Sequence, residues 1–311
     1  MQTTQTTQTS RASRAQISGD LIGIDLGGTA IKLGRFSPAG DLLAALEVPT
    51  PQPAMPGAVT MAIAEAVAQL DPDHLAARIG IGHPGPADAA GRVARIAINL
   101  PGWVDVPLAD WLEPMLDRPV TCANDGNCAV LGEHHSGAAR GCSDVVLLTL
   151  GTGVGGGVLL NGALFSGHRG AAAEPGLIGL DPDGPPCNSG NRGSLESFCS
   201  IRGLGLLSPL PPDELNRRAD AGDAEALAAW QHYGERLGHG ISSLVYLFTP
   251  ELVLLGGGLS GASRHFLPAV WEQVETRVQP ANREGLRIVP AQLGNGAGRL
   301  GAALLAAQRL G

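Results

Sequence analysis

Two stretches of this sequence pair apolar runs around a glycine-rich turn, and they constrain the fold more than any other feature. The first is LIGIDLGGTAIKLGRF, residues 21–36, and the second is DVVLLTLGTGVGGGVLL, residues 144–160. Each pattern predicts a strand, a tight turn and a second strand. Because segments with helix and strand patterns alternate after each hairpin, the repetition predicts two related α/β domains with a cleft between them.

Hydrophobic patterns predict the remaining elements. Apolar periodicity favours helices over residues 57–70, around 108–116, from about 128 to 137, across most of 197–248, around 265–278 and after 295. Short apolar runs favour buried strands within residues 77–86, 118–127, 251–260 and 286–293.

These elements suggest where the domains begin and end. We expect an N-terminal domain over residues 20–121, completed by a C-terminal helix over residues 297–311, and a larger domain over residues 122–296. Residues 1–19 are polar and low in complexity and contain no apolar segment. They are therefore predicted to be a disordered tail and not a signal peptide.

The composition excludes several classes of protein. With a formal net charge of −8, the chain has no excess of cations for a broad nucleic-acid surface. No apolar run reaches the roughly 18 residues needed to span a bilayer, so no membrane partner is expected. The five cysteines are odd in number and scattered, which indicates a reducing, cytoplasmic location and no disulfide framework.

The turn of the first hairpin is a candidate phosphate site. Asp25 lies at the end of a predicted strand and is followed by Gly27, Gly28 and Thr29. Backbone N–H groups and a hydroxyl can bind a phosphate there, and Asp25 can approach its magnesium ion through water. An ordinary hairpin turn is the alternative. Lys32 either faces the phosphates or is solvated.

Two further glycine clusters favour a nucleotide site. The run from Leu150 to Gly157 holds six residues, among them Thr152 and Gly153, that are hard to explain by packing and predict the close approach of a ligand. Gly256, Gly257 and Gly258 follow a predicted strand, where an adenine or ribose can lie against the backbone, although a plain strand-to-helix turn fits as well. Neither cluster matches a P-loop or a Rossmann motif.

The segment CANDGN carries the candidate catalytic group. Asn124 and Asp125 end a predicted strand between the two domains. An aspartate there can accept a proton from an attacking hydroxyl, and the amide can position the molecule that bears the hydroxyl. A common Asn-Asp-Gly turn is the alternative.

With these motifs, the chain from about Leu21 to Leu310 resembles the ROK family of sugar kinases and repressors. The resemblance is carried by IDLGGTAIK, GIGHPGP, INLPGW, ANDGN, LGTGVGGGVLLNGALFSGHRGAAAEPG, LLGGGLS and GNGAGRLGAA. It implies an actin-like ATPase fold, transfer of the γ-phosphoryl group of ATP to a hexose hydroxyl, and a homodimer.

The resemblance also implies roles for individual residues. Asp125 would be the general base, Asp25 the carboxylate on the magnesium side, and Asn124 a sugar contact. The further sugar-side candidates are Gly82, Asn99, Glu174 and Glu196. The implied phosphate contacts are Gly27, Gly28, Thr29, Thr152 and Gly153.

The sequence departs from the family at its zinc site. In the family, a histidine three residues after the glutamate and three cysteines of a C-x-C-G-x-x-G-C loop bind zinc. Here Leu177 replaces that histidine, and the loop keeps only the thiol of Cys187. Leucine cannot bind a metal and one thiolate makes a poor tetrahedral site, so we expect a loop without zinc.

We expect this loop to present Glu196 to the sugar, held by Pro185, Pro186, Asn188, Asn191 and an ion pair of Arg192. A rearranged zinc site of Cys187, Cys199 and His168 is a less favoured alternative, since Cys199 fits an apolar helix face. With leucine at position 177, the sugar also loses a hydrogen-bond partner. His83 is a candidate to replace that partner, and the alternative is that His83 lies in a surface turn.

Three other functions stay open at this point. The family's repressors carry a DNA-binding segment before the first glycine motif, and about twenty polar residues precede it here, which argues against a repressor. A non-catalytic sugar-binding protein or sensor would fit the changed zinc site. A kinase for another hexose, or one using polyphosphate as its donor, is the third alternative, because TPQPAMP resembles the same region of polyphosphate glucokinases.

Overall fold

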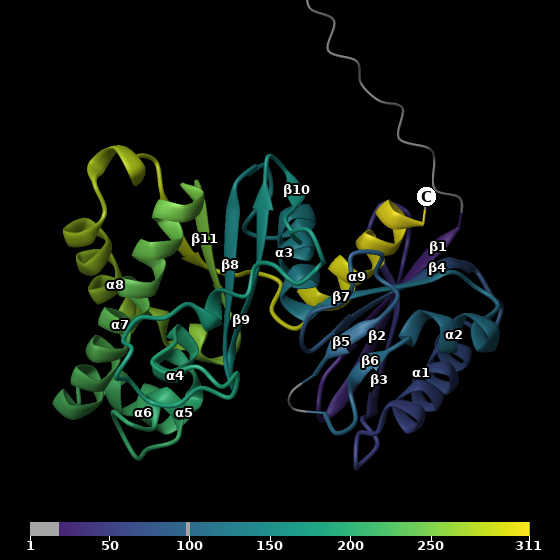
Figure 1. Cartoon of the computed structure of the whole chain (residues 1–311), viewed down its shortest axis with the longest axis horizontal. Coiled ribbons are helices and arrows are strands. Elements are labelled where there is room, and N and C mark those ends of the chain that lie inside the picture. The colour runs from purple at the N-terminus through teal and green to yellow at the C-terminus, as the bar shows by residue number, and fades with distance from the viewer. Residues whose placement is uncertain (1–18, 98–99, 311) are drawn as a thin grey trace, which may run out of the picture.

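The structure is a computed structural model that describes residues 19–97 and 100–310. Figure 1 shows two lobes side by side, with the N-terminal third of the chain in one and most of the remainder in the other. Each lobe is built around a five-stranded sheet. The yellow C-terminal helix returns to the first lobe and lies next to its sheet (Figure 1).

The N-terminal sheet contains parallel and antiparallel strands. In order across the sheet they are β3 (Leu42–Pro49), β2 (Ala30–Phe36), β1 (Asp20–Leu26), β4 (Ala76–His83) and β7 (Val120–Asn124). β1 pairs antiparallel with β2 and parallel with β4. A small antiparallel pair, β5 (Ala94–Ile96) and β6 (Val104–Val106), stands beside it.

Helices cover both faces of this sheet, which is why β1 is apolar almost throughout. Ile22 and Ile24 pack in one cluster with α1 (Pro56–Leu70) and α2 (Leu108–Leu116). Leu21, on the opposite face, packs against α9 (Gly296–Arg309).

The C-terminal sheet repeats the same arrangement. Its strands, in order, are β10 (Ala163–Leu164), β9 (Val154–Leu160), β8 (Val145–Leu150), β11 (Leu252–Gly256) and β12 (Arg287–Pro290). β8 pairs antiparallel with β9 and parallel with β11, as β1 does with β2 and β4. The duplication predicted from the two hairpins is therefore confirmed.

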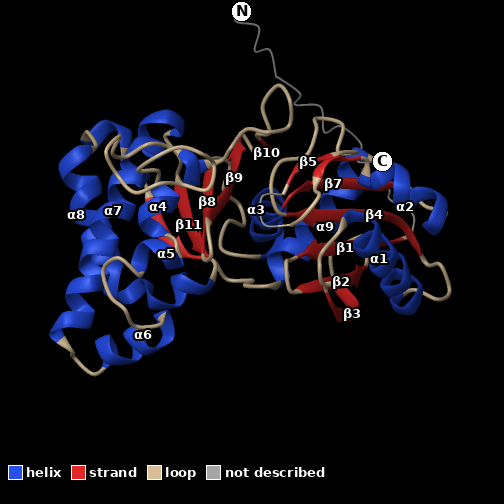
Figure 2. Ribbon diagram, turned by 60° about the horizontal axis from the view of Figure 1, so that its bottom comes forward, coloured by secondary structure: helices blue, strands red, loops and turns tan. Residues whose placement is uncertain are grey.

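This second sheet is also covered on both faces. On one face, α7 (Ala224–Phe248) and α8 (Ser263–Arg277) enclose an aromatic cluster of Trp230, Tyr233 and Phe266. α3 (Asp125–Ser136) lies on the other (Figure 2). The remaining helices are α4 (Leu195–Cys199), α5 (Ile201–Leu204), α6 (Pro212–Asp220) and three single 3-10 turns, η1 (Pro175–Leu177), η2 (Gly258–Ala262) and η3 (Pro280–Asn282).

The helices α3 and α9 lie against each other where the lobes meet (Figure 1). The fully buried carboxylate of Glu133, on α3, accepts hydrogen bonds from the backbone N–H groups of Ala138, Gln292 and Leu293. The last two precede α9. One buried side chain thus fixes the end of α3 to the segment that leads into α9.

Most predicted elements are present, but one boundary differs in a way that matters for the site. The helix expected from about residue 128 begins at Asp125, because the side chain of Asn124 caps it. Within residues 19–97 and 100–310, every helix is too short or too polar to span a membrane. The predicted limits of the two domains stay a prediction.

Candidate active site

A cleft of about 860 Å³ lies between the two sheets, and both lobes contribute to its walls. It brings together most of the residues singled out from the sequence. The first hairpin supplies Asp25, Gly27, Gly28 and Thr29, and the second hairpin supplies Thr152 and Gly153. The other predicted residues that line the cleft are Asn124, Asp125, Glu174, Glu196 and Gly257.

The remaining predicted residues are placed elsewhere or are not described. Lys32 is paired across from Asp25 in the β1–β2 hairpin but does not line the cleft. Gly82 is buried inside β4, where the thiol of Cys128 would lie 3.2 Å from an added Cβ, so packing accounts for this glycine. Gly256 is buried in β11, and Gly258 is exposed but outside the cleft wall. Asn99 lies outside the described residues.

Asp125 is the first residue of α3, and its position follows from local capping. The Asn124 side-chain oxygen accepts hydrogen bonds from the N–H groups of Gly126 (2.8 Å) and Asn127 (3.2 Å), which starts the helix at the end of β7. The Asp125 carboxylate accepts from the N–H of Gly126 at 2.8 Å. Asn124 therefore has a capping role that its motif did not reveal, and its amide NH₂ is left for the cleft.

Four carboxylates line this one cleft, and their pKa values reflect it. Burial, and secondly the charge of Asp25, raise the pKa of Asp125 to about 6. Burial, followed by the charges of Asp125 and Glu196, raises the pKa of Glu174 to about 7. Burial also raises the pKa of Asp25, although Lys32 and Arg299 act in the opposite direction. Clustered carboxyl groups with raised pKa values are typical of functional sites.

The glycines of the second hairpin, residues 144–160, do not all have the same explanation. In this hairpin, a Cβ on Gly156 would lie 2.3 Å from the Leu147 carbonyl oxygen, and one on Gly157 would lie 2.5 Å from that of Gly126. These two glycines are required by packing against β8 and α3, so attributing the whole run to a ligand was wrong. Gly153 and Gly155 belong to the cleft wall instead.

Gly257, in the cleft wall, has a backbone conformation that requires glycine. Its φ is +80°, and a Cβ would lie 2.3 Å from the carbonyl oxygen of Leu150. The backbone of the third cluster therefore passes directly over the end of β8.

The first turn is braced by the TPQPAMP segment. The Thr50 hydroxyl donates to the Gly27 carbonyl oxygen at 2.7 Å, and the Gln52 amide donates to that of Gly28 at 2.8 Å. With both carbonyl groups bonded from behind, the turn is held in one conformation. This bracing is a structural reason for the segment that does not depend on the phosphoryl donor.

A model of the ROK family matches residues 21–309 of this sequence. The chain belongs to the ROK family. A glucokinase of Thermotoga maritima is 34% identical to it over 94% of this chain and 98% of its own length. An N-acetyl-D-glucosamine kinase of Escherichia coli O157:H7 is 34% identical over 91% of this chain and 98% of its own.

A solved structure supports the same conclusion. The ROK family glucokinase from Streptomyces griseus, crystallised with glucose and AMPPNP, is 32% identical to this chain. It superposes with a TM-score of 0.81 over 93% of this chain and all of its own. The two repeated sheets are thus those of the actin-like ATPase fold, as the resemblance implied.

The loop at the ROK zinc position has no set of metal ligands here. Among the described residues no three His, Cys, Asp or Glu side chains come together as a metal site, so Cys187, Cys199 and His168 do not assemble. Cys199 is instead fully buried in the core of the C-terminal lobe, as expected of a small apolar residue. Leu177 lines the cleft in place of the histidine.

Backbone hydrogen bonds hold this loop. The N–H of Cys187 donates to Asn191 (2.8 Å), and that of Gly193 donates to Pro185 (2.7 Å). The expected ion pair of Arg192 is wrong, because this exposed side chain has no carboxylate partner in the described part of the chain. The loop is closed by main-chain bonds, which sequence motifs do not record.

The surviving thiol contacts the sugar-side carboxylate. The Cys187 thiol lies 3.6 Å from one Glu196 oxygen, and the Val154 N–H donates to the other oxygen at 3.1 Å. The Ser189 hydroxyl donates to the Cys187 sulfur at 3.3 Å. The Cys187 thiol thus helps to position Glu196.

His83 is neither a surface residue nor part of the cleft wall. It is fully buried, with Nδ1 3.1 Å from the Pro84 carbonyl oxygen, and burial lowers its pKa to about 4. Both interpretations of this histidine from the sequence were wrong, because neither included the packing of β4.

Proposed function

We infer that this ROK protein is an ATP-dependent sugar kinase, and we propose that Asp125 is the general base for phosphoryl transfer to a hexose hydroxyl. One observation carries the proposal. Asp125 lies in a single cleft with the two glycine turns and with Glu174 and Glu196. In this proposal, one cavity holds the base, the sugar contacts and the phosphate contacts, which is what phosphoryl transfer requires.

Each group has a chemical task in this proposal. The Asp125 carboxylate accepts the proton of the attacking hydroxyl, while Glu174, Glu196 and the Asn124 amide bind neighbouring hydroxyls. The backbone N–H groups of the two glycine turns bind the phosphates, and closure of the lobes excludes water. Asp25 offers the oxygen ligands that Mg²⁺ prefers, and a bound ion would neutralise phosphate charge.

The raised pKa of Asp125 predicts a pH dependence. A general base must be ionised, so kcat/KM is expected to fall as the pH drops through about 6, the pKa of Asp125. An ordinary aspartate would remain ionised to about pH 4. The measurement is kcat/KM for the sugar between about pH 4.5 and pH 8, since this constant reports groups of the free enzyme. Activity that stays constant down to about pH 4.5 would contradict the assignment.

Leu177 predicts a gain in sugar affinity by substitution. Leu177→His adds a hydrogen-bonding group to the cleft wall, at the position where the resemblance to the ROK family implies a histidine. We expect the KM for the sugar to fall about 2- to 10-fold, because one net hydrogen bond contributes about 0.5–1.5 kcal/mol. Leu177→Met is the matched control, since it keeps the size and adds no donor. An unchanged KM in the histidine variant would show that no sugar hydroxyl lies there.

The acceptor and donor can be identified in one assay. We propose glucose or an N-acetylated hexosamine as the acceptor and ATP as the donor. Release of ADP is measured with glucose, N-acetylglucosamine, N-acetylmannosamine and fructose, with and without added zinc, and sugar phosphate formation is measured with polyphosphate. Sugar binding without turnover on any donor would favour the non-catalytic sensor instead.

Two properties of the whole protein are also proposed. All five cysteines are free and buried, which together with the use of ATP favours a cytoplasmic location.

We propose a homodimer, which light scattering on the purified chain would test. A mass of one chain at micromolar concentration would refute it.

A further inference from the structure

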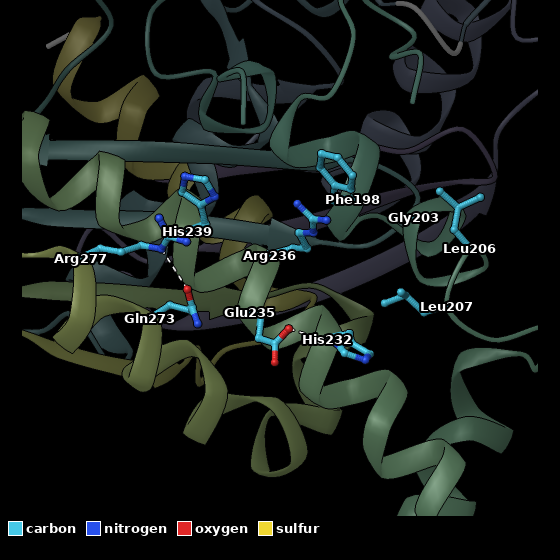
Figure 3. A pocket seen from close by; sticks show the side chains of 10 residues that line it. All are labelled: Phe198, Gly203, Leu206, Leu207, His232, Glu235, Arg236, His239, Gln273 and Arg277. Atoms are coloured by element: carbon cyan, nitrogen blue, oxygen red, sulfur yellow. Dashed lines mark hydrogen bonds and ion pairs between the residues drawn. The ribbon is translucent and has the colours of Figure 1, made fainter. Parts of the chain in front are cut away.

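A second hollow, of about 490 Å³, lies on the C-terminal lobe away from the cleft. It is formed by α4, the segment around α5, and one side each of α7 and α8 (Figure 3). We call it the basic pocket, because Arg236 and His239 of α7 and Arg277 of α8 line it. No role was assigned to these residues from the sequence.

The two arginines of the basic pocket are not neutralised. In the described part of the chain neither forms an ion pair, whereas Arg218 on α6 pairs with Glu214 and Arg264 on α8 with Asp220. Arg277 donates to the side chain of Gln273 at 2.9 Å, and the Arg236 guanidinium lies 4.7 Å from the centre of the Phe198 ring. Both contacts orient a guanidinium without removing its charge.

The positive charge of the two arginines acts on the pKa of a neighbouring histidine, His239. Figure 3 shows the His239 ring next to the Arg277 side chain. Burial lowers the pKa of His239, and the charges of Arg277 and Arg236 lower it further. Glu235 is the one acidic residue among the lining side chains. Its carboxylate lies 3.0 Å from Nδ1 of His232. The pocket is therefore suited to an anion.

The rest of the lining restricts what kind of anion fits. Phe198, Leu206 and Leu207 give the pocket an apolar wall, and the side chain of Leu206 is 64% exposed. An inorganic ion would leave this wall in contact with water, whereas a carbon skeleton would cover it. Guanidinium groups bind the oxygens of phosphates and carboxylates in pairs, and two of them match the charge of a phosphate monoester, about −1.5 to −2, better than the single charge of a halide or a carboxylate.

We propose that the basic pocket binds a small organic phosphate, with its phosphate group held by Arg236 and Arg277 and its carbon skeleton against Phe198 and Leu206. Two sources share this chemistry. One is the hexose phosphate that the proposed reaction forms, and the other is a nucleoside phosphate.

The site is connected to the cleft through one short helix. α4 presents Phe198 to the basic pocket and, two residues earlier, Glu196 to the cleft. The next helix, α5, is hydrogen-bonded to the turn of the second hairpin, because the N–H of Ile201 donates to the Gly151 carbonyl oxygen at 2.8 Å. Occupancy of the pocket therefore acts on the sugar side of the cleft. This second part rests on the proposed function.

The binding test uses His239 as a local reporter. The NMR resonance of its ring proton is assigned by comparison with His239→Gln. It is followed as a function of pH in the presence of glucose 6-phosphate, AMP or sulfate. Sulfate is included because it does not itself titrate in this range. A phosphate between the arginines cancels their charge, so the pKa of His239 is expected to rise with saturation. Arg236→Gln and Arg277→Gln should abolish the rise, and Arg218→Gln, on α6, should preserve it.

The probes and the variants decide between the outcomes. If the rise is half complete at a lower concentration of glucose 6-phosphate than of AMP, the hexose phosphate is the source, and the reverse order identifies the nucleotide. No change in His239 up to about 10 mM probe, or a change that both arginine variants keep, overturns the site. A dimer that becomes monomeric in the arginine variants would show that a second copy of the chain covers the pocket, which also overturns it.

The link to the cleft has its own readout. Glucose 6-phosphate is expected to raise the KM for the sugar more in the wild-type protein than in Arg277→Gln, in which only competition at the cleft remains. Equal inhibition of both proteins would refute the link while the His239 titration still decides whether the site exists. That titration needs no catalytic activity, so failure of the proposed kinase function would be seen separately.

Discussion

Asp125→Asn is expected to lower kcat for phosphoryl transfer by about 10²- to 10⁴-fold, the usual contribution of a general base. Asparagine has nearly the same shape and can still accept the Gly126 N–H, which lies 2.8 Å from the carboxylate. The start of α3 should therefore be preserved, and the loss isolates proton transfer. Single-turnover kinetics with ATP and the sugar acceptor measure it.

Nucleotide binding provides the control for this variant. Removing one negative charge from a cleft lined by four carboxylates should leave the affinity for AMPPNP unchanged or increase it, because the phosphates are themselves anionic. Asp73→Asn, at an exposed position between α1 and β4, is the matched carboxylate change away from the cleft. Turnover retained in Asp125→Asn would refute the role of this residue, and lost AMPPNP binding would indicate a structural defect instead.

Glu133→Ala is expected to destabilise the protein by about 2–4 kcal/mol, the largest effect on stability that we predict. The substitution removes the acceptor of three backbone N–H groups, and each donor left without a partner costs about 1–3 kcal/mol, partly relieved where water can enter. Urea denaturation measures the change as a lower midpoint at an unchanged slope.

Two further substitutions show whether the acceptor is the cause. Glu133→Gln keeps one oxygen for Gln292 and Leu293 and should lose about half as much stability as the alanine variant. Glu275→Ala, on the exposed side of α8, should change stability by less than about 0.5 kcal/mol. A loss below about 1 kcal/mol in Glu133→Ala would mean that water replaces the carboxylate.

Features that depend on neighbouring residues were predictable from the sequence. The hairpins at residues 21–36 and 144–160 predicted two repeated sheets, because alternation of apolar residues and glycine turns is a local property. Asp25 and Asp125 follow strands whose ends meet at the edge of the sheet, and they line one cleft. Glu174 and Glu196 line the same cleft, and they were expected there only from the resemblance to the ROK family.

Features that depend on distant contacts were not predictable. Gly156 and Gly157 looked like ligand contacts, and only the close approach of β8 to Gly156 and of α3 to Gly157 shows that packing requires them. His83 lies in a motif rich in glycine and proline, which is typical of a surface turn, yet β4 buries it completely. Glu133 had no motif at all, because its three donors include two residues almost 160 positions away.

The sequence by itself determined the duplicated α/β architecture, the cleft and most of the groups that line it, because each of these depends on short patterns that form strands, turns and caps locally. Only the tertiary structure decided how the altered zinc loop is closed, which glycines serve packing, and that Arg236, His239 and Arg277 surround one pocket. The glycines pack among β8, β9 and α3, and the basic pocket forms where α4, α7 and α8 meet. The distances between side chains on separate elements are not encoded in any single stretch of the chain.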